Sequence, residues 1–187
     1  MNRLKIFVLI LTALFFASPT LADWAANAAD KQQMKAVSAI EKMRTAIPRT
    51  EQYFEQAYAY AILPSVTRVG FGFGGAGGKG FVIAGDNAIG KTRFWQFTSG
   101  IQAGAKNFSM IVFFKDKTAL EKFKASDIQF MGQAGVAFAT AGLAGTPTYS
   151  DGVAIVTMTR FGLMGEFTIS GAKFSYKALA AEKEPAE

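Results

Sequence analysis

The chain has 187 residues, a formal net charge of +6 and neither His nor Cys. This length is enough for one domain with a hydrophobic core. The missing residue types exclude thiol nucleophiles, disulfides, zinc sites of the Cys/His kind and an imidazole general base, and we expect no cofactor and no metal site.

The first 22 residues have the form of a cleavable signal peptide. Arg3 and Lys5 precede a mostly apolar run from Ile6 to Ala17, and small residues stand before a cut after Ala22. The run is shorter than the roughly 20 apolar residues of a membrane-spanning helix. We therefore expect an exported protein, located in the periplasm, at a membrane surface or outside the cell. Loss of residues 1–22 removes two cations and no acid, which leaves a net charge of +4.

Residues 23–63 are rich in Ala and free of Gly, and they predict two helices, about 28–47 and 51–62. Pro48 and Pro64 end them. Apolar residues of the first helix recur at three- and four-residue steps, on one arc. They are Met34, Val37, Ile40, Met43 and Ile47. We expect this arc to face the core.

Three lysines, Lys31, Lys35 and Lys42, cluster on the opposite side of the first helix. A solvated helix face is the ordinary interpretation of such a stripe. The functional interpretation is an amphipathic helix that lies against anionic lipid, with Trp24 as an interfacial anchor.

Residues 66–177 are rich in Gly, Phe and β-branched residues, and they predict short strands with Gly-containing turns. One short helix is predicted in "DKTALEKFKA", and "IQFMGQAGVAFATAGLAG" after it reads as a small-residue strand region. The expected fold class is α+β: N-terminal helices packed on a strongly curved antiparallel β-barrel or sandwich. We expect one domain over 23–177 and a disordered acidic tail over 178–187.

The stretch "GDNAIGKT" matches the phosphate-loop pattern G-x-x-x-x-G-K-[ST] through Gly85, Gly90, Lys91 and Thr92. That motif needs a helix after the loop, whose N-terminal N–H groups hold the phosphates. "RFWQFTSG" follows instead and predicts a strand. We therefore interpret the match as a chance one, in a β-turn where Asp86-Asn87 supplies the turn chemistry, and expect no nucleotide.

The neighbouring run "GFGFGGAGGKG" contains G-x-G-x-x-G at Gly72, Gly74 and Gly77, but both flanks predict strands rather than a strand and a helix. Lys79 beside it is a candidate to meet an anion through a nest of backbone N–H groups. The acids stand at turn and helix-start signals, and no spaced pair suggests a carboxylate dyad. We expect no catalytic residues and no enzyme activity.

The run "YAYAILPSVTRVGFGFGGAGGKGFVI" at 58–83 resembles the signature of the SYLF domain family, also called Ysc84 or DUF500. "FWQFTSGIQAGA", "IVFFKDKTALEKF", "FMGQAGVAF" and "TRFGLMGEFTISGAKF" resemble later segments of that family in the same order. The resemblance covers about 34–177. It implies a lipid-binding module: eukaryotic members associate with phosphoinositides, some bind actin, and bacterial relatives are exported. It implies no catalytic residues.

The leading expectation is a bacterial exported member that binds anionic phospholipid at the cell envelope through Lys31, Lys35, Lys42 and Trp24. The modest charge and the expected export disfavour nucleic acid as a partner. A structural or protein-interaction role at the envelope is the second hypothesis, with an envelope protein as partner. An eight-stranded outer-membrane barrel is the third; the signal peptide and the Gly/aromatic strands fit it, but the helical front and the charged terminus "EKEPAE" do not.

Overall fold

The computed structural model describes residues 24–125, 129–131, 138–140 and 149–179. For residues 129–131, 138–140 and 162–171 it describes the backbone alone. The predicted signal peptide (1–22) and all but the first two residues of the predicted tail (178–187) lie outside the described residues.

Helix α1 spans Lys31–Ala46 and begins at a side-chain cap. The Asp30 carboxylate accepts hydrogen bonds from the backbone N–H groups of Gln32 at 2.8 Å and Gln33 at 3.3 Å. These bonds, the one from Gln32 first, hold the pKa of Asp30 below its usual value. The Gln33 side chain accepts in turn from the N–H of Asn27 at 2.8 Å, so donors before and inside the first turn are satisfied together.

The buried side of α1 differs in part from the predicted arc. Ile40 and Met43 are buried as expected, but Met34 is 42% exposed, and Ala36 and Ala39 are buried in its place. The helix is therefore turned about its axis toward its small residues, which allow its backbone to approach the sheet closely. One consequence is that the lysine side of α1 borders the sheet instead of pointing directly away from it.

After α1 come a short 3₁₀ helix, η1 (Pro48–Thr50), and helix α2 (Glu51–Gln56). The prediction of a helix to residue 62 is wrong after 56, because strand β1 (Ala59–Ala84) begins there. Ala59 pairs with Phe114, and Ala59 and Ala61 are buried in the core. Ladder pairing and burial outweigh the helix preference of alanine, which is a weak local term.

Two more long strands, β2 (Asn87–Phe114) and β5 (Val153–Ala178), pair antiparallel with β1 in the order β1-β2-β5. Strand β3 (Gln129–Met131) adds to the outer side of β5, and β4 (Phe138–Thr140) pairs with β5 in parallel. Helix α3 (Lys117–Lys124) follows β2, as "DKTALEKFKA" predicts, and is capped by the Asp116 carboxylate, which accepts from the N–H of Ala119 at 2.9 Å.

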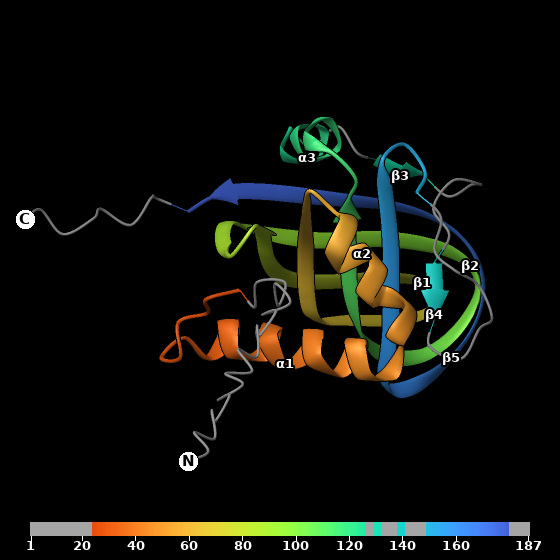
Figure 1. The fold of residues 1–187 in the computed structure, drawn as a ribbon. Helices are drawn as coiled ribbons and strands as arrows, with labels where there is room; N and C mark the ends of the chain where they lie inside the picture. The colour runs from red at the N-terminus through yellow and green to blue at the C-terminus, as the bar shows by residue number, and fades with distance from the viewer. Residues whose placement is uncertain (1–23, 126–128, 132–137, 141–148, 180–187) are drawn as a thin grey trace, which may run out of the picture.

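The sheet lies between the helices, with α1 and α2 on one side and α3 on the other (Figure 1). We call the side that α1 and α2 cover the helix face; its core joins Met43 to Ile62, Ile111 and Phe113, which are all fully buried. The core on the opposite side, the α3 face, joins α3 to the sheet. It includes Leu63, Val66, Phe94, Phe114, Phe123 and Phe174.

Strand β1 bends within its Gly-rich segment, where Gly72 has a φ of 70°. Its second half then passes close to its first half: a Cβ added to Gly78 would lie 2.8 Å from a methyl carbon of Val66, and one added to Gly80 would meet the carbonyl of Ile62. Pro64, which has no N–H for a ladder, sits at a register shift between Leu63 and Val66. The glycines of this run allow the backbones of the two halves of β1 to approach each other closely.

The α+β class, the N-terminal helices and the single short helix are confirmed. The prediction of a strongly curved barrel or sandwich is wrong: four of the five described strands form an open antiparallel sheet, β1-β2-β5-β3, which is neither closed nor strongly curled, and β4 pairs with β5 beside it. Each long strand replaces several predicted short ones, because glycines that read as turns lie inside continuous ladders, such as Gly74 opposite Thr98.

Candidate functional site

Seven large apolar side chains form an exposed patch on the sheet beyond α1, which we call the exposed apolar face. Its most exposed members are Phe71 at 88%, Ile101 at 81% and Phe73 at 69%. The full set is Val69, Phe71, Phe73, Trp95, Phe97, Ile101 and Phe161. Scattered apolar residues on a surface are ordinary, but a contiguous cluster marks an interaction site.

Strand alternation places four of these side chains on the helix face, and Phe73 lies with them because its ring stacks with that of Phe97. Val66 is buried in the α3-face core, so Val69 and Phe71, at odd offsets from it, point the other way. Phe94 is buried in the same core, so Trp95 and Phe97 also point to the helix face. The exposed apolar face is therefore the part of the helix face that α1 and α2 leave uncovered.

Glycine partners on β1 leave two rings of this face uncovered on that side. Trp95 stands opposite Gly77 and Phe97 opposite Gly75, so no cross-strand side chain covers either ring from β1. Phe73 and Phe97 stack with ring centroids 6.4 Å apart, which organises two of the rings into one surface.

A row of cations borders the exposed apolar face along the same strands. Its members, all exposed, are Lys79, Lys91, Arg93, Lys173 and Lys177. Lys79 is paired directly with Arg93, and Lys91 with Lys177. Like charges in directly opposed positions destabilise a sheet. Strands β1 and β2 contain no Asp or Glu, and Lys91 interacts electrostatically with the Asp30 carboxylate, which lies outside the sheet.

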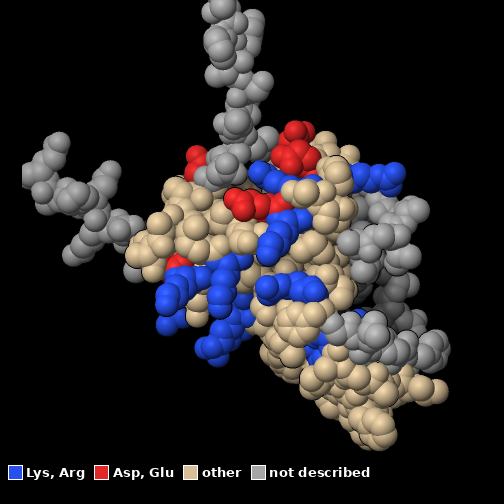
Figure 2. Space-filling view, turned by 90° about the horizontal axis from the view of Figure 1, so that it is seen from below, with Lys and Arg blue, Asp and Glu red and all other residues tan. Residues whose placement is uncertain are grey.

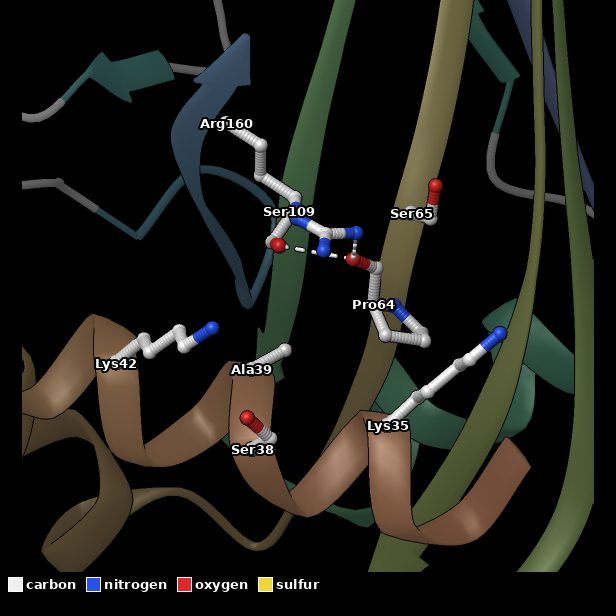
Figure 3. A pocket seen from close by; sticks show the side chains of 8 residues that line it. All are labelled: Lys35, Ser38, Ala39, Lys42, Pro64, Ser65, Ser109 and Arg160. Carbon is white, nitrogen blue, oxygen red and sulfur yellow. Dashed lines mark hydrogen bonds between the residues drawn. The ribbon is translucent and has the colours of Figure 1, made fainter. Parts of the chain in front are cut away.

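A cleft of about 190 Å³ opens between α1 and the sheet on the helix face. Its lining contains three cationic side chains, three serines and no acid: Lys35, Ser38, Ala39, Lys42, Pro64, Ser65, Ser109 and Arg160. Figure 3 shows the two lysines reaching from α1 on either side of Ala39, with Arg160 opposite them. Seen from the side of α1, Lys and Arg gather on part of the surface, while a projecting end shows no Lys, Arg, Asp or Glu in this view (Figure 2).

Hydrogen bonds to one carbonyl fix the sheet side of the cleft. The oxygen of Pro64 accepts from Arg160 Nη1 at 3.2 Å and from Ser109 Oγ at 2.9 Å. It is free for these bonds because it lies at the register shift of β1. Ser65 Oγ accepts from Asn107 Nδ2 at 2.8 Å.

The predicted lipid-contact residues divide into two groups. Lys31, Lys35 and Lys42 are exposed on α1, and the last two line the cleft. The prediction of Trp24 as an interfacial anchor is wrong. Trp24 is 6% exposed and packs on Phe81 with ring centroids 5.3 Å apart, because the segment before α1 lies against the sheet.

The two glycine motifs lie where the sequence placed them, in strand surroundings. Gly85 turns the chain between β1 and β2, and Gly90, Lys91 and Thr92 lie in β2 with no helix after them. The turn is one residue earlier than predicted, since Asn87 already belongs to β2. The run before Lys79 is part of the β1 ladder, so its N–H groups form no anion nest, although Lys79 itself is exposed.

Sequence reasoning missed the exposed apolar face and Arg160. The available signal was "GFGFGG", in which two Phe residues stand among glycines that cannot cover them. Within the described residues, no group of three or more acids converges as a metal site.

None of the helices in the described part of the chain is long and apolar enough to cross a bilayer.

Comparisons with protein-family models, with curated proteins and with solved structures found no match to this chain.

Proposed function

We propose that this protein is an exported module that binds peripherally to anionic phospholipid at the cell envelope. The observation that carries the proposal is the exposed apolar face, seven large apolar side chains bordered by a row of cations, on a sheet whose strands β1 and β2 contain no acid. An apolar surface next to a basic one suits the boundary between hydrocarbon and anionic headgroups. The resemblance to the SYLF family supports the same function, and the proposal assigns the protein no catalytic step and no cofactor.

The α1 lysines keep a secondary role in this proposal. Lys31, Lys35 and Lys42 are exposed and add positive charge on the helix-bearing side of the molecule. Each basic side chain near an anionic surface contributes about 1 kcal/mol. Trp24 has no part in lipid contact, because it is buried.

The two tryptophans make the proposal testable without a label. Trp95 is 54% exposed and lies on the exposed apolar face, whereas Trp24 is 6% exposed in the helix-face core. In a Trp24→Phe variant, the remaining emission should shift to the blue and lose quenching by iodide when vesicles with phosphatidylglycerol are added. The matched Trp95→Phe variant should bind but show no such change.

Co-sedimentation with vesicles measures binding directly. We expect more protein with vesicles that contain phosphatidylglycerol than with pure phosphatidylcholine, and a decrease in that excess at high salt. Equal and negligible sedimentation with both, together with unchanged Trp95 emission, would refute the proposal.

A protein-interaction role is the second candidate, because an exposed apolar face also fits a protein partner. It predicts one envelope protein bound at equal stoichiometry. Its binding should bury Trp95 in solution and should not depend on lipid charge.

A further inference from the structure

We infer that the cleft between α1 and the sheet binds a phosphate group. Three cations and three serines line it and no carboxylate does. Ser109 donates its proton to the Pro64 carbonyl, so the two lysines, Arg160, Ser38 and Ser65 supply the donors that a phosphate oxyanion needs. Its volume of about 190 Å³ is below the roughly 300 Å³ at which drug-sized pockets begin. The cleft therefore suits a small anionic group rather than a large apolar ligand.

The helix side of the cleft is a single helical face. Lys35, Ser38, Ala39 and Lys42 follow the i, i+3, i+4, i+7 spacing that brings side chains into one row. Ala39 at the centre is 6% exposed and has a short side chain, which leaves the space between the two lysines open. The turn of α1 toward its small residues is what directs this row at the sheet.

The sheet side supplies donors that are already oriented. Arg160 uses one N–H on the Pro64 carbonyl, which holds its guanidinium at the cleft and leaves further N–H groups of the fork for a ligand. Ser65 Oγ accepts from Asn107, so its own O–H proton remains available to donate. A phosphate here would meet charge from both walls and hydrogen bonds from fixed donors.

The phosphate could belong to a phospholipid headgroup or to a soluble molecule, and the chemistry of recognition is the same. In its lipid form the inference rests on the proposed function. Ser65 and Phe71 are six residues apart on β1, about 20 Å along an extended strand. The cleft thus borders one end of the exposed apolar face, where Phe161 directly follows Arg160, and lies well away from Phe71 at the other end.

Calorimetric titration of the full mature chain with inorganic phosphate and with glycerol 3-phosphate tests the soluble form. We expect saturable binding that Lys35→Gln/Lys42→Gln weakens at least tenfold. The matched control is Lys117→Gln/Lys122→Gln, which removes two exposed lysines from α3 and should leave binding within twofold. Ser65→Ala changes no charge and should weaken binding about threefold, which diffuse attraction to positive charge would not produce.

Vesicles with phosphatidylglycerol test the lipid form, with glycerol 3-phosphate as competitor. Competition that is lost in Lys35→Gln/Lys42→Gln assigns the site to headgroups, and phosphate binding without competition assigns it to soluble phosphates; both support the inference. No saturable binding of either phosphate, with equal vesicle binding by the cleft and α3 variants, would overturn it. Phe71→Ala/Phe73→Ala separates the proposals, because it should weaken vesicle binding and leave soluble phosphate binding unchanged.

Discussion

The contribution of the exposed apolar face to membrane binding can be predicted from two rings. Phe71 is 88% exposed and Phe73 69% exposed, so both can pass from water into lipid without any rearrangement of the fold. Full burial of a Phe side chain is worth about 1.5 to 3 kcal/mol. After allowance for their partial exposure and for the methyl groups that remain, Phe71→Ala/Phe73→Ala should cost about 3 kcal/mol of binding. This corresponds to a partition coefficient about 150-fold lower.

The same substitution should hardly change the fold. Both rings are exposed in the free protein, and the Phe73–Phe97 stack is the only ring contact among described residues that the double variant removes. We expect the free energy of unfolding to change by less than about 1 kcal/mol. Urea unfolding followed by Trp24 emission checks this, because Trp24 is buried in the core that the substitution does not touch.

The assay is a vesicle titration at fixed phosphatidylglycerol content, with Tyr58→Ala as the matched control. Tyr58 is 49% exposed but lies before the start of β1, next to α2 and away from the exposed apolar face. A loss of less than fivefold in the Phe71/Phe73 variant, or an equal loss in Tyr58→Ala, would refute the assignment of membrane contact to this face.

Three further predictions concern stability. Gly80→Ala should lower the free energy of unfolding by about 3 kcal/mol in urea denaturation, because its Cβ would overlap a backbone carbonyl. In the control Gly77→Ala the nearest atom to the new Cβ lies at 3.7 Å, so the free energy of unfolding should change little. Similar losses of stability in the two variants would contradict this prediction. Asp30→Ala should lower the Tm at neutral pH. Because the pKa of Asp30 is lowered in the folded state, its stabilisation is present above pH 3.8 and is lost as the pH falls through that lowered pKa. A difference in Tm that does not depend on pH would argue against the cap. Arg93→Glu should raise the free energy of unfolding by up to about 1 kcal/mol in the same urea assay, because it turns the like-charge pair with Lys79 into an opposite-charge pair. The same substitution should weaken binding to anionic vesicles. A loss of stability would count against the pairing of Arg93 with Lys79.

Local signals in the sequence predicted the helices and the turn but not the length of the strands. The periodicity and the prolines placed α1 and its end, and the aromatic residues after Thr92 predicted a strand where a phosphate loop would need a helix. Ala59 and Ala61 could not be assigned from local preference, because their place in β1 depends on pairing with residues more than fifty positions away.

The site was predicted only in part, because it too depends on contacts between residues far apart in the sequence. The lysine stripe of α1 was visible in the sequence, but its direction depends on which residues the sheet accepts, and the sheet accepts Ala36 and Ala39. Arg160 joins Lys42 only through the fold, from a strand more than a hundred residues further along the chain. Trp24 looked like an anchor because a terminal segment gives no sign of its own docking against Phe81.

The order of side chains along β2 fits a partner that changes from apolar to anionic along the length of the strand. Read from Phe97 back toward the start of β2, the residues on the helix face are Phe97, Trp95, Arg93 and Lys91. They change from apolar through an amphipathic indole to cations over about 20 Å of strand. A bilayer has the same order with depth: hydrocarbon, then the interface where Trp concentrates, then anionic phosphate. A protein partner would need an acidic rim at this distance from an apolar centre. An anionic bilayer supplies both layers at once, and it would also relieve the like-charge pairing that the free sheet carries.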